Sequence, residues 1–288
     1  MTEAGLRFQV SSAAPYNPRP MRIGAWQFDV RRGDVDSNLE EVERGVRAAA
    51  ADGVELLAFP EMWPTSFVPD ADENDWVAAS ERAVEALRGL SRVHGVALCG
   101  SAFARGPAGA LPRNRLHLFE RGEEVLAFDK VHLFTPTAES LAFSAGEAPP
   151  RTVELRGARV SGVVCYDLRF APLLRVPFRD EAEILVVPAQ WPDSRASHWS
   201  ALVTGRAVEM QACLLAANRI GREEVGRRRF ELSFPGNSLV VGPHGTVLAR
   251  GRGERGLVSA EIELAEIRDL RRQVPVRSDD RGDLYSTW

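Results

Sequence analysis

The chain contains 288 residues, of which 44% are hydrophobic and 26% charged, a balance typical of a globular protein that buries a substantial core. Its formal net charge of -4 and its dispersed arginines give no basic face, which argues against nucleic acid as a partner. Three cysteines without CxxC spacing argue against a disulfide scaffold or a zinc site, and the apolar runs are too short for a membrane span. We therefore expect a cytoplasmic protein that binds neither metal nor membrane.

Residues 1–20 are rich in Pro, Ser and Ala, so we expect a loose extension followed by a single domain over 21–288. The stretch MRIGAWQFDV opens this domain and predicts a buried strand. After it, Ser37 and Glu40 form a capping-box pattern that predicts the start of an amphipathic helix ending at Gly53. The run VELLAFPE then predicts a second buried strand.

The alternation of helix and strand continues and then gives way to hairpins. Residues 75–94 predict a second helix, and the strand GVALCGSAFA follows it. Both RLHLFERGEEVLAFDK and TVELRGARVSGVVC contain two strand-like runs around a turn with glycine, which is typical of hairpins. The stretches AEILVVPAQW and SHWSALVTGRAVEMQACLLAANRIG add a strand, a helix and a further strand, and hairpins close the domain.

The order of these elements favours an α/β fold in which two mixed sheets pack together with helices on both outer faces, a four-layer α-β-β-α sandwich. One short run could be mistaken for a cofactor site. GRGERG at 251–256 formally matches GxGxxG, but a strand follows it and not a helix. We therefore expect a hairpin turn there and no dinucleotide site.

Three predicted strands end on residues that a catalyst could use. Glu61 follows LLAFP, Lys130 follows VLAFD and Cys165 follows VSGVV, and active sites of α/β folds collect at the carboxyl ends of strands. Each has a structural alternative. The glutamate could cap a helix, the lysine could be a solvated hairpin residue, and the cysteine could be a small buried hydrophobic residue. We favour that alternative for Cys99 and Cys213, which lie inside apolar runs.

Lys130 is the only lysine among the 36 Lys and Arg residues of the chain. An ammonium is a compact point charge and a guanidinium is a wide planar fork, so the two do not fit the same site. A cysteine nucleophile needs a base or a nearby cation, because a free thiol is mostly protonated at neutral pH. Glutamate, lysine and cysteine together would suit hydrolysis through a thioester. We expect Lys130→Arg to reduce activity with little change in stability.

The segments FPEMW, DKVHLF and CYDLRF, in this order, resemble the three signature stretches of the nitrilase superfamily of carbon-nitrogen hydrolases. The similarity runs from residue 21 to about 285. CYDLRF, together with HWSALVTGRAVEMQ downstream, is most similar to the branch of ω-amidases and deaminated-glutathione amidases. The resemblance implies an amidase that releases ammonia from a small carboxamide. It also implies that no metal or organic cofactor takes part and that the protein forms a homodimer or a higher homo-oligomer.

The resemblance further implies a role for each matching residue. Glu61 corresponds to the general base, Cys165 to the nucleophile and Lys130 to the cation that holds the tetrahedral oxyanion. The backbone N–H of Tyr166 would be the second oxyanion donor. Glu139 stands where this branch often carries a second glutamate, which orients the lysine and assists proton transfer.

Two arginines are candidates for substrate binding. Arg169, four residues past Cys165, could grip a carboxylate such as that of a 2-oxo acid with a terminal amide, or could form a structural pair with Asp167 or another acid. Arg195, in WPDSRASHW, is the second candidate. The segment RFAPLLR lacks the glutamate that is common after proline in this branch, and Met210 replaces the usual asparagine. These departures could alter substrate or subunit contacts.

Two other functions stay open. A nitrilase or an N-carbamoyl amide hydrolase belongs to the same superfamily, and an ammonia-release screen over amides, nitriles and carbamoyl compounds separates these activities. A non-catalytic binding protein on this fold would be expected to have lost a member of the triad. All three members are present in this sequence, which favours an enzyme.

Overall fold

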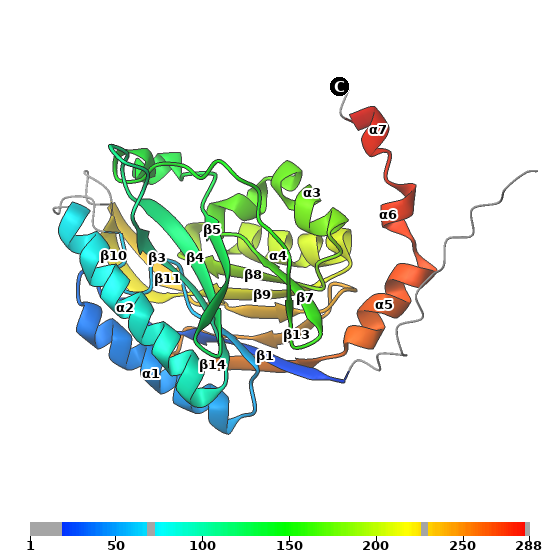
Figure 1. The fold of residues 1–288 in the computed structure, drawn as a ribbon, viewed down its shortest axis with the longest axis horizontal. Helices are drawn as coiled ribbons and strands as arrows, with labels where there is room; N and C mark the ends of the chain where they lie inside the picture. Colours follow the sequence, from blue (N-terminus) through cyan, green and yellow to red (C-terminus); the bar gives the residue numbers. More distant parts are fainter. Residues whose placement is uncertain (1–18, 68–72, 226–229, 286–288) are drawn as a thin grey trace, which may run out of the picture.

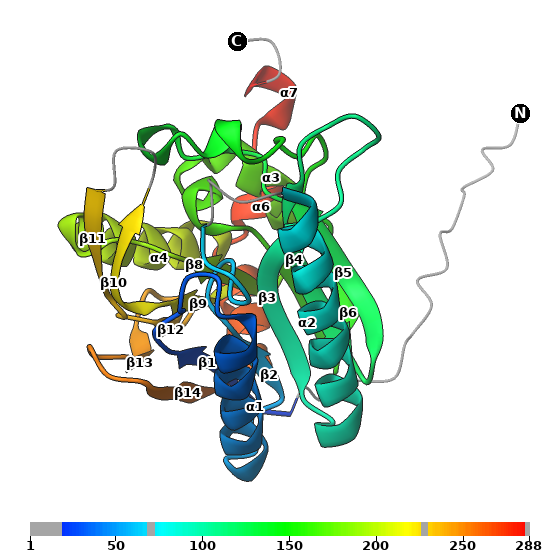
Figure 2. The same cartoon turned by 90° about the vertical axis from the view of Figure 1, so that its left-hand side faces the viewer.

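The computed structural model describes residues 19–67, 73–225 and 230–285. Two six-stranded sheets pack against each other, and helices cover the outer face of each (Figure 1; Figure 2). The predicted four-layer α-β-β-α sandwich is therefore confirmed. The expected extension over 1–20 lies outside the described residues except for its last two positions. Within the described ranges, no helix is long and apolar enough to cross a membrane.

The first sheet has the strand order β14-β1-β2-β3-β4-β5. Its strands β1, β2 and β3 are parallel, because a helix carries the chain back between each pair. These elements are β1 (Met21–Gln27), α1 (Val35–Ala51), β2 (Leu56–Ala58), α2 (Glu73–His94) and β3 (Ala97–Ala104). The strands that pair antiparallel in this sheet are β4 (Arg113–Glu120), β5 (Glu123–Asp129) and β14 (Gly256–Ile262).

The second sheet repeats this plan with the strand order β13-β12-β9-β8-β7-β6. Its strands β7 (Ala158–Gly162), β8 (Ile184–Ala189) and β9 (Cys213–Asn218) are parallel. Helix α3 (Ala171–Arg179) connects β7 to β8, and α4 (Ala196–Met210) connects β8 to β9. Its antiparallel strands are β6 (Val153–Leu155), β12 (Leu239–Val241) and β13 (Val247–Arg250). A separate hairpin, β10 (Ile220–Val225) and β11 (Phe230–Pro235), leaves the end of β9.

Short helices follow several of the strands, and three more form the C-terminal segment. The 3-10 helices are η1 (Thr135–Thr137), η2 (Glu139–Leu141), η3 (Cys165–Arg169) and η4 (Asp193–Arg195). Along one side of the sandwich run α5 (Leu264–Gln273), α6 (Val276–Asp279) and α7 (Gly282–Tyr285) (Figure 1).

The core lies on both sides of the first sheet, because successive side chains of a strand point to opposite faces. In β2, Leu56 and Ala58 pack toward the second sheet, whereas Leu57 packs among the residues beneath α1 and α2. Helix α1 lies so close to β1 that a Cβ atom at Gly45 would be 2.5 Å from the Trp26 ring. This packing fixes the strand ends that carry the site.

Most predicted elements are confirmed, including the hairpins β4–β5 and β6–β7 and the helix–strand pair α4–β9. Two local predictions are wrong. Helix α1 begins at Val35, and its N-cap is Asp34, which accepts a hydrogen bond from Ser37 N at 3.1 Å. An aspartate caps as well as a serine, so the earlier side chain sets the helix start and Ser37 is already helical. The run 251–256 is not a hairpin turn, because it carries the chain from β13 in the second sheet to β14 in the first.

Candidate active site

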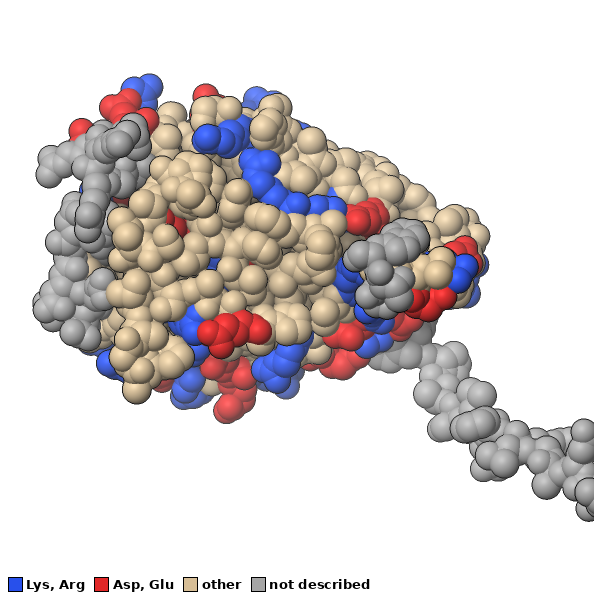
Figure 3. Space-filling model, turned by 90° about the horizontal axis from the view of Figure 1, so that it is seen from above, with Lys and Arg blue, Asp and Glu red and all other residues tan. Residues whose placement is uncertain are grey.

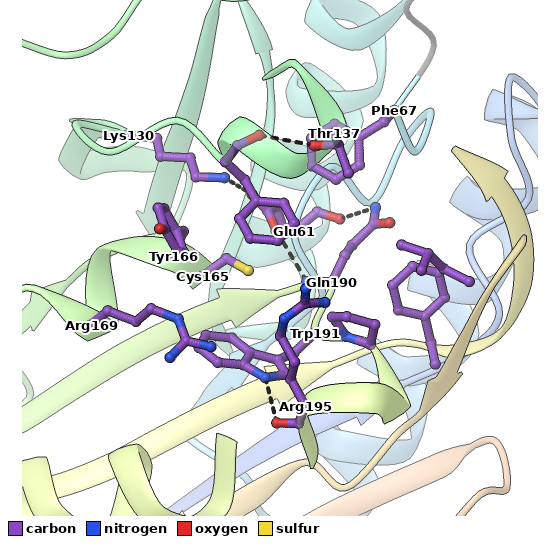
Figure 4. Close-up of a pocket in the computed structure, with 14 residues that line it drawn as sticks. Glu61, Phe67, Lys130, Thr137, Cys165, Tyr166, Arg169, Gln190, Trp191 and Arg195 are labelled. Carbon is purple, nitrogen blue, oxygen red and sulfur yellow. Dashed lines mark hydrogen bonds and ion pairs between the residues drawn. The ribbon is translucent and has the colours of Figure 1, made fainter. Parts of the chain in front are cut away.

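A pocket lies where the carboxyl ends of β2, β7 and β8 meet the end of β5 (Figure 4). The structure brings together in its lining Glu61, Lys130, Cys165, Tyr166, Arg169 and Arg195. Glu139 lies directly behind the lysine, within hydrogen-bonding distance of its ammonium group. The remaining walls are largely apolar and include Phe67, Phe134, Trp191, Leu232 and Phe234. Such a pocket suits a small molecule with a few polar groups.

The Lys130 ammonium stands between two carboxylates. Its Nζ atom lies 2.8 Å from Glu61 Oε1 and 2.8 Å from Glu139 Oε2. All three side chains are only 1% exposed, so the alternative of a solvated hairpin lysine is wrong. Burial lowers the pKa of Lys130, but the charges of Glu139 and Glu61 outweigh it, and the net shift is upward. The lysine therefore carries its charge at neutral pH.

The Glu139 carboxyl shares this lysine with Glu61, and its own pKa is raised. Burial is the main cause, and the Lys130 charge opposes it without cancelling it. The backbone N–H of Phe134 donates a hydrogen bond to Glu139 Oε2 at 2.6 Å. One cation between two acids thus holds both side chains in place, while burial keeps Glu139 a weaker acid than a free glutamate.

The Glu61 carboxylate is held by donors from three elements. Oε1 accepts a hydrogen bond from Asn114 Nδ2 of β4 at 2.9 Å, besides that from Lys130. Oε2 accepts one from the backbone N–H of Gln190, just past β8, at 3.1 Å. The Gln190 side chain returns a hydrogen bond to the backbone carbonyl of Glu61 at 2.8 Å. These bonds tie the ends of β2 and β8 together, so Glu61 is not a helix cap.

Cys165 is the first residue of η3. Its backbone φ is 46°, in the left-handed region that a non-glycine residue rarely adopts. Such local strain is common at nucleophiles that a sharp turn presents to a pocket. Burial raises the pKa of the Cys165 thiol, the negative charge of Glu61 raises it further, and the Lys130 charge opposes both. The resting thiol is therefore protonated at neutral pH. Cys99 and Cys213 are also buried, and burial raises the pKa of the Cys213 thiol to about 12.

The turn after the cysteine is fastened to the segment after the lysine. Asp167 Oδ1 accepts hydrogen bonds from the backbone N–H and from Nδ1 of His132, each at 2.8 Å. The His132 ring stacks on Phe170 with a centroid distance of 3.6 Å. Asp167 is fully buried and occupied by these partners, so the predicted alternative of an Arg169–Asp167 pair does not occur.

Two guanidinium groups face the pocket on the side away from Lys130 (Figure 4). The Arg169 guanidinium lies 4.6 Å from the Trp191 ring centroid, and its Nη2 lies 3.3 Å from His198 Nδ1. The Arg195 guanidinium lies 5.7 Å from the Phe134 ring centroid. Among the described residues, neither arginine forms an ion pair with an acidic side chain. Both are therefore available to a negatively charged ligand.

Figure 3 shows the molecule from above the view of Figure 1. In Figure 3 the face seen from above is mostly uncharged and is crossed by a row of basic side chains. Because the one lysine of the chain is buried, these basic side chains are arginines. In the described part of the chain, no group of three or more His, Cys, Asp or Glu side chains is arranged to hold a metal ion.

Sequence reasoning missed a buried network beside the site. Arg219, 1% exposed, donates hydrogen bonds to Gln190 Oε1 and Ser66 Oγ, each at 3.0 Å. Its guanidinium also pairs with Asp29 at 2.9 Å and with Glu223. Gln190 is hydrogen-bonded both to Arg219 and to Glu61, so this network helps to hold the Glu61 carboxylate in position. The partners are scattered along the sequence, so the only available signal was an arginine placed directly after a buried strand.

Residues 22–272 match the family model of carbon-nitrogen hydrolases. The chain belongs to this family. A curated relative, the 2-oxoglutaramate amidase of Bacillus subtilis (strain 168), is 33% identical over 267 residues, which cover 91% of this chain and 98% of the relative. The ω-amidase YafV of Escherichia coli (strain K12) is 30% identical over 264 residues, which cover 88% of this hydrolase and 94% of the relative.

Solved structures give the same assignment. A mutant of the amidase from Nesterenkonia sp. AN1 has a TM-score of 0.81 at 28% identity, covering 96% of this hydrolase and 100% of that chain. That structure shows covalent addition of the acetamide moiety of fluoroacetamide at the active-site cysteine. A second mutant of this amidase, from the nitrilase superfamily, has a TM-score of 0.81 at 30% identity. The match covers 95% of this hydrolase and 98% of that chain. The resemblance to nitrilase-superfamily hydrolases is therefore confirmed.

Proposed function

We propose that this carbon-nitrogen hydrolase is an amidase for a small carboxamide that carries a carboxylate, such as the ω-amide of a 2-oxo dicarboxylic acid. The observation that carries the proposal is the buried set of Glu61, Lys130 and Cys165 beside two arginines that form no ion pair with a described acidic side chain. The names of its relatives, 2-oxoglutaramate amidase and ω-amidase, support this substrate class. The products would be a dicarboxylic acid and ammonia.

In the first half of the reaction, Glu61 takes the proton of the Cys165 thiol as the thiolate attacks the amide carbon. The carbon–sulfur bond forms and the carbonyl oxygen becomes an oxyanion. The Lys130 ammonium and the backbone N–H of Tyr166 stabilise that charge. The protonated Glu61 then gives its proton to the amide nitrogen, the carbon–nitrogen bond breaks, and ammonia leaves a thioester on the enzyme.

In the second half, water takes the place of ammonia. Glu61 removes a proton from the water as the water oxygen attacks the thioester carbon. The Lys130 ammonium and the backbone N–H of Tyr166 stabilise the new oxyanion. The carbon–sulfur bond breaks, the thiolate recovers the proton from Glu61, and the acid departs. Glu139 keeps the Lys130 ammonium oriented throughout, because both of its carboxylate oxygens lie within 2.9 Å of Lys130 Nζ.

An ammonia-release assay tests the proposed activity. The panel contains ω-amides of 2-oxo acids, glutamine, simple aliphatic amides, nitriles, carbamoyl compounds and oxidised, deaminated glutathione. We expect the fastest turnover on the 2-oxo ω-amides, loss of turnover in Cys165→Ala, and an acyl adduct at Cys165 by intact-mass and peptide mass spectrometry. Faster turnover of nitriles or carbamoyl compounds would assign one of those alternatives. Binding of an amide without turnover would favour a non-catalytic protein.

Substrate choice makes a separate prediction. Replacing Arg169 by Met removes a guanidinium that can grip a carboxylate, so KM for carboxylate-bearing amides should rise roughly 10- to 100-fold, the scale of one charged hydrogen-bonded pair. KM for neutral amides of similar size should change little. Arg179→Met serves as the control, because its side chain is 54% exposed and lies outside the pocket. Equal losses on charged and neutral amides would make Arg169 a structural residue.

We also propose that the protein acts in the cytoplasm as a homodimer or a higher homo-oligomer and that residues 21–288 form one domain. Exposed apolar side chains on α4 and β13, Val208 at 51% and Leu248 at 43% exposure, support self-association. Sedimentation velocity at micromolar concentration tests it, and a monomer under these conditions would contradict it.

A further inference from the structure

We infer that Asn114 is a positioning residue of the hydrolase, which directs the proton of the Cys165 thiol to one oxygen of Glu61. The inference rests on the proposed function and adds a residue that the catalytic set does not include. Asn114 is 1% exposed and is the second residue of β4.

One residue contacts the catalytic groups in three ways. Asn114 Nδ2 donates a hydrogen bond to Glu61 Oε1 at 2.9 Å and lies 3.5 Å from Glu139 Oε1. Its backbone carbonyl accepts the backbone N–H of Lys130 at 2.9 Å. Asn114 therefore fixes the main chain at the lysine and the side chains of both acids.

The two oxygens of Glu61 consequently differ. Oε1 accepts hydrogen bonds from Lys130 Nζ and from Asn114 Nδ2, so its lone pairs are engaged. Oε2 accepts only the backbone N–H of Gln190 among the described residues, at 3.1 Å. A carboxylate oxygen without a second donor is the better proton acceptor. Asn114 thus leaves Oε2 as the oxygen that receives the thiol proton.

The asparagine has a feature that packing alone would not favour. Its Oδ1 atom is buried and has no hydrogen-bond partner among the described residues. A buried acceptor without a partner is unfavourable, and a leucine of similar size would fill the space without it. The amide at this position is therefore explained by its Nδ2 donor, whose partners among the described residues are the two carboxylates.

The test compares Asn114→Leu, which removes the donor, with Asn114→Asp, which replaces it by a third carboxyl group. Two readouts are measured, ammonia release and the rate at which iodoacetamide alkylates Cys165 at neutral pH. The second needs no knowledge of the substrate. We expect kcat of Asn114→Leu to fall about 10- to 100-fold, with KM within about threefold and a matching fall in alkylation rate. Asn114→Asp should lose more.

The control is His117→Leu on the same strand. His117 is buried and bonded to Glu124 at 2.6 Å, but it points to the opposite face of β4. It should change the melting temperature and leave both rates at the wild-type level. Wild-type kcat and alkylation rates in both Asn114 variants would overturn the inference, as would equal losses in His117→Leu. If Asn114→Leu does not fold, Asn114→Asp decides by the same two rates. A wild-type enzyme that alkylates rapidly but releases no ammonia would refute the proposed function instead.

Discussion

At the scale of single residues, the lysine at position 130 shows what its site requires. Its one nitrogen reaches three carboxylate oxygens of Glu61 and Glu139 within 2.9 Å. A guanidinium spreads its donors over a plane and needs room on both sides, and the fully buried space between two carboxylates does not offer it. This geometry explains why position 130 is a lysine in a chain whose other Lys and Arg residues are all arginine.

Lys130→Arg tests the requirement. We expect kcat/KM to fall by about 10²-fold or more, because the oxyanion loses a positioned donor. The burial of Lys130 also revises the expectation of unchanged stability. A wider side chain forced into a closed site costs about 1 to 3 kcal/mol, which urea denaturation would measure. Arg105→Lys, in an exposed pair with Glu81, is the matched control and should change neither quantity appreciably. A near-wild-type kcat/KM in Lys130→Arg would show that position 130 needs only a positive charge.

At the scale of elements, the hairpin β10–β11 is joined to the body through Arg219. The guanidinium binds Asp29, Ser66, Gln190 and Glu223, and it lies 4.6 Å from the Phe234 ring centroid. β11 in turn places Leu232 and Phe234 in the pocket wall. The anchor of the hairpin and the support of Glu61 are therefore one network.

Removing the Arg219 guanidinium should loosen both the hairpin β10–β11 and the contacts that hold Glu61. In Arg219→Met, Glu223 loses its cation while it stays buried, so the free energy of unfolding should fall by about 3 to 5 kcal/mol. Chemical denaturation measures the loss. Arg222→Met, on the same hairpin but in an exposed pair with Glu231, should change stability by less than about 0.5 kcal/mol. Equal effects of the two substitutions would mean that the buried network contributes no more than a surface ion pair.

The sequence allowed prediction of the residues that follow strands, since hydrophobic runs and their ends are local signals. Glu61, Lys130 and Cys165 belong to this class. Asn114 does not, because its importance depends on which face of β4 it occupies and on the register with β5. Arg219 depends on partners as distant as Asp29. The start of α1 was misplaced for a local reason, since Asp34 and Ser37 are both good caps and only the structure shows which one is used.

At the scale of the whole molecule, the two sheets share a core. One apolar cluster contains Leu56 and Leu116 of the first sheet together with Leu185 and Leu214 of the second. Neither sheet could therefore bury its inner face alone. The fold class was predictable because each half alternates strand and helix, whereas the crossing of β14 into the first sheet was not, since no local pattern marks a strand that changes sheets.

Such a shared core should unfold as one unit. Hydrogen exchange followed by mass spectrometry in increasing denaturant should expose the amides of β1 and of β9 at the same denaturant concentration, because each strand packs against the other sheet. Exchange of one sheet well before the other would indicate two independently stable units and contradict the proposed single domain over 21–288.

The pairing of β1 with β14 also matters while the protein is being made. The ribosome completes β1 early, but the strand that covers its outer edge comes from residues 256–262. At about 5–20 residues per second, that edge stays unpaired for on the order of 10 to 50 s in every nascent chain. An open strand edge is a template for pairing with other chains. Aggregation during expression is therefore a hazard of unfinished chains of this hydrolase, and slower translation prolongs it.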